Sequence, residues 1–233
     1  MGNQQSQKQG KDGILFFVKY PELGMVKSRL SAKLDDTLTL LLYRAFVEDL
    51  LTMLEKIKAQ ILICYHPSHT LKEYKNWLGD RYQYMPQKGA FLGGRMSNCF
   101  LQGFTALDFK KLILIGSDSP DLPREIINNA FQKLEKYDTV IGPCTDGGYY
   151  LIGFTNQCLS PMVFQDIPWS TSAVYQKTMN KLKNKGVQTF ILPEWRDVDT
   201  LDDLYALYLR NQDNDFQTSN TMMMVKKHLH SIK

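Results

Sequence analysis

Short apolar runs alternate with amphipathic segments along most of this chain, and this alternation limits the folds that it can adopt. The apolar runs predict strands at residues 14–19, 59–65, 81–86, 112–115, 139–141, 149–154 and 187–192. The segments between them predict helices at residues 26–57, 70–78, 95–107, 124–137, 172–185 and 201–210. We therefore expect a three-layer α/β fold, with a mostly parallel central sheet and helices on both of its faces.

The strand at 149–154 follows the strand at 139–141 without a helix between them, so we expect it to lie antiparallel or at an edge. Residues 13–210 are predicted to form one domain. Residues 1–12 are polar and lack periodicity, which predicts a disordered arm. Residues 211–233 are polar apart from a run of methionines, and both a docking helix and a loose tail remain open for them.

The composition excludes several classes of protein. Hydrophobic residues make up 43% of the 233 residues, which argues against wholesale disorder. No run of 18 apolar residues is present, so we expect no stable membrane insertion. The four cysteines are scattered, which predicts free thiols in a reducing compartment and so a cytoplasmic location. Residues 1–6 match a myristoylation pattern with Gly2 as acceptor, although such short patterns often arise by chance.

The excess positive charge of this chain lies near its N-terminus. Residues 1–33 contain six basic and two acidic residues, which accounts for the whole net charge of +4. A protein that binds nucleic acid would show a wider basic face. The charge distribution therefore favours a small phosphorylated ligand over nucleic acid.

Three basic side chains surround the first predicted strand-to-helix turn. Lys19 ends the strand, the chain turns at Gly24, and Lys27 and Arg29 lie in the predicted first turn of the next helix. The N–H groups and partial positive charge of a helix N-terminus suit phosphate. The spacing is neither that of a Walker A loop nor that of a dinucleotide-binding loop. We expect a nucleotide-phosphate site here, with a solvated basic turn as the alternative.

A carboxylate follows the apolar run at 112–115. Ligands of open α/β sheets bind at the carboxyl ends of the strands, where Asp118 is expected to lie. A carboxylate at this position can hold Mg²⁺ or Mn²⁺, which prefer oxygen ligands and share them with substrate phosphates. The alternative is that Asp118 only shapes a turn before the next helix.

Two further acids follow the last predicted strand. Asp197 and Asp199 flank a single valine, and an extended segment would point both side chains the same way. Helix capping or solvation explains one acid, whereas two on one side of a loop suggest a cation. We expect Asp199 to be a second metal ligand, and Asp197 is the weaker candidate.

The glycine-rich loop at 142–153 carries a third candidate acid at its tip. Asp146 could orient or deprotonate an acceptor hydroxyl, and Gly147 and Gly148 allow close approach of the backbone to a ligand. Tyr149 extends this predicted acceptor or sugar pocket. A simple hairpin turn at the Asp-Gly pair is the alternative.

Two further segments offer ligand-binding groups. Gln87 and Gly93, on the loop at 87–96, could read a nucleobase, and Arg95 would lie near the phosphates. Trp169, beside a capping Ser-Thr pair, is either a platform for a sugar or a core residue.

Taken together, these motifs resemble one family. FVKYPELGMVKSRL, the Q-x-G-x-x-L-G-x-R-M loop, LIGSDSPDLP, GPCTDGGYYLIG, PWST and DVDTLDDL resemble the DUF2064 group of candidate glycosyltransferases. The resemblance covers residues 14–207 in the right order and implies the nucleotide-diphospho-sugar transferase fold, of glycosyltransferase A type. It also implies that Asp118 and Asp199 bind the metal, and that Lys19, Lys27 and Arg29 bind the nucleotide phosphates.

The sequence departs from many glycosyltransferases of this fold in one respect. Their D-x-D motif is replaced by Gly116-Ser117-Asp118, with a single acid, as in nucleotidyltransferases of the same fold. The VKSRL stretch also looks like that of the phospholactate guanylyltransferases. We expect a metal-dependent glycosyltransferase with a sugar-nucleotide donor and a small-molecule acceptor. Nucleotidyl transfer from a nucleoside triphosphate and non-catalytic nucleotide binding are the alternatives, and a homodimer remains open.

Overall fold

The computed structural model describes residues 11–228. Gly2 and most of the predicted arm therefore lie outside the described residues. The prediction of an arm through residue 12 is wrong at its end, because strand β1 (Lys11–Lys19) begins at Lys11. Asp12 pairs with Lys111 in the register of the neighbouring strand, and their side chains form a 3.6 Å ion pair that supports this extension.

The described residues form one mixed sheet in the order β3-β2-β1-β4-β6-β5-β7. The other strands are β2 (Gln60–His66), β3 (Gln83–Pro86), β4 (Phe109–Ile115), β5 (Thr139–Pro143), β6 (Tyr149–Thr155) and β7 (Thr189–Ile191). Strand β6 is antiparallel to both β4 and β5, and the other pairs are parallel. The predicted antiparallel strand is thus confirmed, but it lies inside the sheet, where its apolar residues are covered on both faces.

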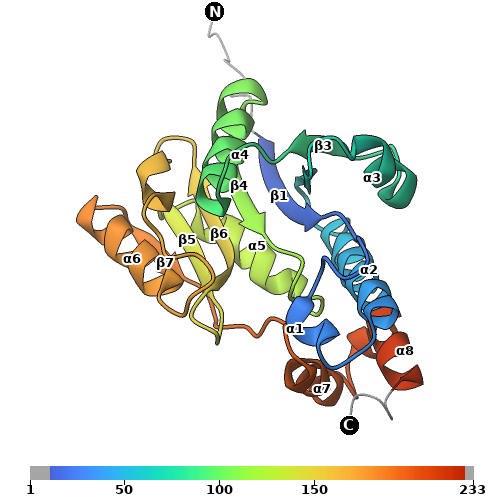
Figure 1. The fold of residues 1–233 in the computed structure, drawn as a ribbon. Coiled ribbons are helices and arrows are strands. Elements are labelled where there is room, and N and C mark those ends of the chain that lie inside the picture. Colours follow the sequence, from blue (N-terminus) through green and yellow to red (C-terminus); the bar gives the residue numbers. More distant parts are fainter. Residues whose placement is uncertain (1–10, 229–233) are drawn as a thin grey trace, which may run out of the picture.

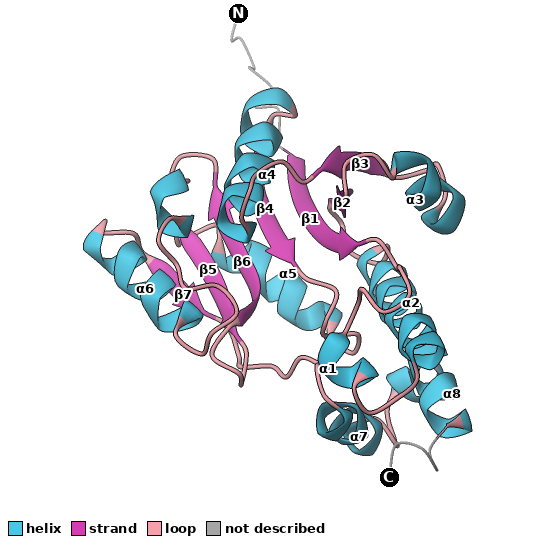
Figure 2. Ribbon diagram, viewed as in Figure 1, coloured by secondary structure: helices cyan, strands magenta, loops and turns pink. Residues whose placement is uncertain are grey.

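Helices cover both faces of the sheet (Figures 1 and 2). One face packs against α2 (Asp36–Leu54), α3 (Leu71–Leu78) and α5 (Arg124–Lys133). The other packs against α4 (Leu92–Ala106), the 3-10 helix η1 (Pro161–Phe164) and α6 (Val174–Asn184). Alternate residues of β1 face the two layers, with Phe16 on the first side and Leu15 and Phe17 on the second. Burial on both sides explains why this strand is a continuous apolar run.

The long helix predicted at 26–57 is wrong, because two helices occupy this stretch. Helix α1 (Ser28–Ser31) is one turn long, and α2 begins at Asp36. The carboxylate of Asp35 accepts a hydrogen bond from the backbone N–H of Leu38 at 2.9 Å, which caps the start of α2. The periodicity of the apolar residues continues across the break, so it did not reveal the cap.

The C-terminal segment forms a helix that packs against α2 (Figure 1). Helix α8 (Asn220–Lys227) follows α7 (Leu201–Arg210) and the 3-10 helix η2 (Asp215–Thr218). Asp49 of α2 accepts hydrogen bonds from the N–H groups of Asn220 and Thr221 at 3.0 and 2.7 Å. Met222 and Val225 are fully buried. Within residues 11–228, no helix combines the length and the apolar character that crossing a bilayer requires.

Candidate functional site

A cleft of about 900 Å³ opens at the carboxyl edge of the parallel strands. Loops that follow β1, β2, β3, β4, β5 and β7 contribute to its walls, as expected for an open α/β sheet. The predicted site residues that line it are Lys19, Arg29, Gln87, Arg95, Asp118, Asp146, Gly148, Tyr149, Trp169 and Asp199. The fold thus brings together side chains from segments that are far apart in the sequence.

Lys27 links the two predicted metal ligands. It precedes α1 in the left-handed conformation, with φ of 48°, and its side chain is 4% exposed. The ammonium forms ion pairs with Asp118 and, at 2.9 Å, with Asp199. Burial alone would lower the pKa of Lys27, but the two carboxylates outweigh it and raise that pKa above the usual value. Lys27 is therefore a charged counter-ion of these acids. It lines a smaller cavity of about 440 Å³ with Arg29, Asp118 and Asp199, and it does not line the main cleft.

Asp118 and Asp199 fit a divalent cation on their outer oxygens. The closest approach of the Lys27 ammonium to each carboxylate is to its Oδ1 atom, so the Oδ2 atoms are the better candidates for a cation. The two side chains are 49% and 33% exposed, so a ligand can reach them. Arg29 lies 3.7 Å from Oδ2 of Asp199. Carboxylate oxygens beside a phosphate-binding cleft are the donor set that Mg²⁺ and Mn²⁺ use.

The Asp-Val-Asp segment has the predicted alternation. Val198 is fully buried, while Asp197 and Asp199 both line the cleft. The N–H of Val198 donates to the carbonyl of Asp118 at 2.8 Å, which fixes this segment beside the end of β4. Burial, together with the nearby charges of Asp146 and Asp199, raises the pKa of Asp197 to about 6.

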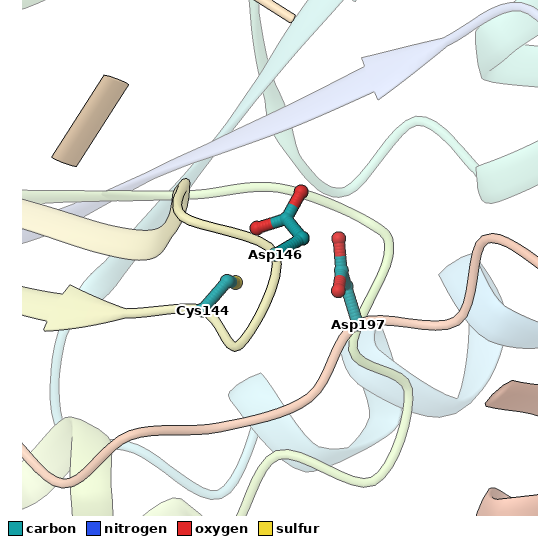
Figure 3. Close-up of side chains that lie close together, drawn as sticks. All are labelled: Cys144, Asp146 and Asp197. Carbon is teal, nitrogen blue, oxygen red and sulfur yellow. The ribbon is translucent and has the colours of Figure 1, made fainter. Parts of the chain in front are cut away.

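A cysteine joins two of these acids. Cys144, Asp146 and Asp197 place a sulfur and two carboxylate oxygens within 4.8 Å of one another (Figure 3). The sequence identified Cys144 only as a free thiol, and it did not place that thiol beside Asp197. Cys144 lies close to Asp197 because a β-bridge joins Cys144 to Trp195, and no local sequence pattern reveals that bridge.

The β5–β6 turn holds Asp146 by backbone geometry. Gly147 has φ of +89°, and a Cβ atom there would lie 2.2 Å from the carbonyl oxygen of Ser172, so only glycine fits. The carboxylate of Asp146 accepts a hydrogen bond from the N–H of Gly148 at 2.8 Å. Asp146 therefore shapes the hairpin turn and also lines the cleft, whereas its role toward an acceptor hydroxyl stays a prediction.

Part of the Gln87 side chain is used in hydrogen bonds within the protein. Its side-chain amide donates to the carbonyl oxygens of Cys64 at 2.7 Å and Val18 at 3.4 Å. Its own carbonyl oxygen makes no hydrogen bond with the described residues and is the group left for a ligand. Arg95 is half-buried, and its Nε donates to the carbonyl of Gly89 at 3.1 Å.

Gly93, Trp169 and Gly24 have packing or turn roles. A Cβ atom on Gly93 would lie 2.3 Å from the carbonyl oxygen of Phe164 and 2.9 Å from the indole nitrogen of Trp169. Trp169 is half-buried, stands edge-on to Tyr149 at 6.3 Å, and lines both the main cleft and a second cavity beside α4. Gly24 has φ of +71° and allows the turn before α1. Lys27, Gly93, Gly24 and Gly147 are not among the residues that line the main cleft.

Asp121, near Asp118 in the sequence, serves the fold. Its side chain is 2% exposed and forms an ion pair with Arg210 at 2.6 Å. It also accepts hydrogen bonds from the amide of Asn211 at 2.8 Å and the indole of Trp195 at 3.2 Å. These contacts fasten α7 and the segment that carries Asp197 to the end of β4.

One solved structure matches nearly the whole chain. It is that of a protein from Desulfovibrio desulfuricans G20, provisionally assigned as a nucleotide-diphospho-sugar transferase. The two chains are 39% identical with a TM-score of 0.92, and the match covers 96% of this chain and 97% of the other. The predicted fold, that of the nucleotide-diphospho-sugar transferases, is confirmed.

More distant structures share the fold alone. A cytidylyltransferase from Leptospira borgpetersenii serovar Hardjo-bovis is 15% identical with a TM-score of 0.53, over 96% of this chain and 97% of that one. A 4-diphosphocytidyl-2C-methyl-D-erythritol synthase from Anaerococcus prevotii DSM 20548 is 10% identical with a TM-score of 0.56, over 87% and 99%.

The family assignment rests on two matches. No curated protein matches this chain at a significant level. The model of a family described as uncharacterized proteins conserved in bacteria, DUF2064, matches residues 50–171, and the 39% identical structure extends the similarity over most of the remainder. The chain belongs to the DUF2064 family.

Proposed function

We propose that this protein is a metal-dependent glycosyltransferase that uses a sugar nucleotide as donor and a small molecule as acceptor. One observation carries the proposal. A single cleft combines the carboxylates of Asp118 and Asp199 with the cationic side chains of Lys19, Arg29 and Arg95. Acids that hold a divalent cation beside bases that hold phosphate form the arrangement that a nucleoside diphosphate requires.

In this proposal, Asp118 and Asp199 hold Mg²⁺ or Mn²⁺ through their outer oxygens. The ion would neutralise the diphosphate and stabilise it as the leaving group. Lys27 keeps the two carboxylates in place, and Arg29 and Lys19 contribute positive charge to the phosphates. At about 4 Å and an effective dielectric near 20, each pair of unit charges contributes roughly 4 kcal/mol, so charge dominates the binding of the donor.

The other wall of the cleft suits the acceptor and the sugar. Trp169 and Tyr149 provide aromatic surface against which a sugar ring can pack. Asp146 lies on the same wall and is positioned to orient an acceptor hydroxyl or to accept its proton. Gln87 offers its free carbonyl oxygen to the exocyclic donor of a base.

Nucleotidyl transfer from a nucleoside triphosphate is the second candidate. The single acid of Gly116-Ser117-Asp118 favours it, because the D-x-D motif of many glycosyltransferases is absent. The two reactions release different products. Glycosyl transfer releases a nucleoside diphosphate, whereas nucleotidyl transfer releases pyrophosphate.

The test combines binding with product analysis. A thermal-shift screen of nucleotides and sugar nucleotides, with and without Mn²⁺, should identify the donor, because ligands of the native state raise its melting temperature. Asp118→Asn should abolish the Mn²⁺-dependent part of the shift, and Asp80→Asn, which removes a remote and exposed charge, should leave it unchanged. If D118N keeps both nucleotide affinity and its dependence on Mn²⁺, the proposed metal site is wrong.

A further inference from the structure

A second group of ligand atoms lies at the wall of the cleft, where Asp146 and Asp197 line the cleft and Cys144 is buried behind them. The sulfur of Cys144 and carboxylate oxygens of Asp146 and Asp197 all lie within 4.8 Å of one another. Figure 3 shows the three side chains converging from two segments, the β5–β6 turn and the stretch after β7. The proposed function assigns no joint role to these three residues.

The thiol of Cys144 has no partner of its own. The residue is 7% exposed, and its sulfur makes no hydrogen bond with any residue that the structure describes. It lies at the edge of the apolar core, beside the two carboxylates (Figure 3). Burial and the charges of Asp197 and Asp146 raise the pKa of this thiol, so without a cation the group stays protonated and inert.

The two acids also form no ion pair of their own within the described residues, and Lys27 acts on Asp197 only from a distance. Lys27 pairs with Asp118 and Asp199, but neither Asp146 nor Asp197 forms an ion pair within residues 11–228. Asp146 is exposed, whereas Asp197 is partly buried. A partly buried carboxylate such as that of Asp197 is normally paired with a basic group or bound to a metal. Within residues 11–228, no ion pair supplies that positive charge to Asp197.

Backbone contacts hold the two segments in register. The N–H of Thr145 donates to the carbonyl of Trp195 at 3.2 Å, and the N–H of Trp195 donates to the carbonyl of Pro143 at 3.0 Å. Ligand atoms around a tetrahedral zinc ion lie roughly 3.5 Å apart, given metal–ligand distances of about 2.0 to 2.3 Å. The three atoms here lie within 4.8 Å of one another, so binding of the ion requires them to close by about 1 Å.

We propose that Cys144, Asp146 and Asp197 form a three-ligand site for a thiophilic divalent cation of the Zn²⁺ class, with a fourth position open to the cleft. One sulfur and two oxygens in a site for four ligands suit Zn²⁺ or Co²⁺, whereas Mg²⁺ prefers six oxygens. Binding converts the Cys144 thiol to a thiolate and releases its proton to the buffer, so that three negative ligands surround a doubly charged ion.

This site shares no ligand with the one at Asp118 and Asp199, although the charges of those two acids reach Cys144 and Asp197. It does not depend on which nucleotide or reaction the cleft serves. When the site is filled, Asp146 becomes a metal ligand, and an acceptor hydroxyl would meet the ion at the open position instead of a free carboxylate. The three-ligand, one-open-position geometry is the one that protein zinc sites use when they act on a bound molecule.

Cobalt titration of the full-length protein tests the proposal. Co²⁺ added to chelator-treated protein should give a near-ultraviolet thiolate-to-cobalt charge-transfer band that saturates at one equivalent, and Zn²⁺ should abolish it by competition. Cys144→Ser should lose the band. Cys158→Ser, which alters a thiol that hydrogen-bonds to Asp138, is the matched control and should retain it. Asp118→Asn should also retain it, which separates this site from the proposed donor site.

Loss of a carboxylate ligand gives a second readout. Asp197→Asn should weaken Co²⁺ binding about 100-fold or more, since even groups that only support a ligand contribute about 10- to 100-fold. Circular dichroism checks that each variant is folded, and D197N keeps the test decisive if C144S is not. Absence of the band in the wild-type protein, or its survival in a folded C144S, would overturn the proposal, as would unchanged Co²⁺ affinity in D197N.

Discussion

Lys27 combines three properties that rarely coincide in one lysine: a left-handed backbone, a side chain that is almost fully buried, and two carboxylate partners. A left-handed lysine costs roughly 1 kcal/mol or more of conformational energy. The ion pairs with Asp118 and Asp199 offset this cost, because the two acids repel each other without an intervening cation. The ammonium therefore holds the two carboxylates together in the structure without a metal.

Replacement of Lys27 by methionine tests this role. Lys27→Met should lower the free energy of unfolding by about 2 kcal/mol, because it leaves two neighbouring carboxylates unpaired while their partial exposure limits the cost. Mn²⁺ should restore part of that loss by taking the place of the ammonium. Urea denaturation with and without Mn²⁺ measures both effects. Lys72→Met, at an exposed position of α3, is the control, and equal stability of the two variants would contradict the prediction.

Asp197 should make stability depend on pH. Its pKa is about 6 in the folded protein, above the value of 3.8 expected when unfolded, so folding favours the protonated form. The contribution of protonated Asp197 to the free energy of unfolding is fully present below the unfolded pKa, and it is lost as the pH rises from about 4 through about 6. In chelator-treated protein, Asp197→Asn should be more stable than wild type by about 1–2 kcal/mol above pH 7, after allowance for partial exposure. Denaturation at pH 8 and pH 4 checks this, and the advantage should vanish at the lower pH.

At the scale of secondary-structure elements, turns and helix ends determine where the residues of the site lie. The hairpin between β5 and β6 places Asp146 because Gly147 lets the chain pass within contact distance of Ser172. Helix α8 packs against α2 because Asp49 caps its first N–H groups and Met222 is buried. In both cases a residue in one element determines where a distant element can lie.

Gly147→Ala should destabilise the hairpin through two effects, an unfavourable φ and a collision of the new Cβ with the backbone of Ser172. Gly79→Ala isolates the first effect, because Gly79 has a similar φ of +93° but a Cβ added there would meet nothing within 4 Å. We expect G147A to lose about 2 kcal/mol more than G79A in urea denaturation. Equal losses would show that Ser172 moves aside without cost.

Asp49→Ala should loosen α8. Removal of a carboxylate that caps a helix costs about 1 kcal/mol on average, and up to about 2 kcal/mol. Trypsin should then cut faster at Lys226 and Lys227 while the rest of the domain resists. Glu73→Ala, an exposed acid on α3, provides the comparison. Unchanged cleavage in D49A would show that burial of Met222 and Val225 is enough to hold the helix.

At the scale of the whole molecule, the sheet gathers the acids and the bases into one cleft, so cation and donor should bind cooperatively. In the proposed function, Mn²⁺ would share Asp118 and Asp199 with the Lys27 ammonium, which would weaken its binding, whereas a diphosphate would add ligands of its own. We expect a nucleoside diphosphate to tighten Mn²⁺ binding at least about 5-fold, and Mn²⁺ to tighten nucleotide binding by the same factor. Isothermal titration in both orders measures the coupling, and independent binding would argue against a shared site.

Much of the fold follows from local patterns. Apolar runs such as 112–115 identified the strands because residues buried on both faces must be apolar throughout. The absence of a helix before β6 identified its antiparallel direction. Periodicity did not reveal two element boundaries. At residues 32–35, the cap of α2 by Asp35 breaks the helix although the apolar periodicity continues. At Lys11, the strand begins earlier than predicted because its pairing depends on the neighbouring β4.

The sequence by itself determined most of the strands and helices and placed Asp118 and Asp199 at one edge of the sheet, because parallel strands end at the same edge. Only the tertiary structure decided which groups meet there. Lys27 and Asp199 are 172 positions apart, and their ion pair depends on two loops being folded against each other. Burial and charge compensation are properties of the assembled molecule, so the counter-ion role of Lys27 and the approach of Cys144 to Asp197 have no signature in any short stretch of sequence.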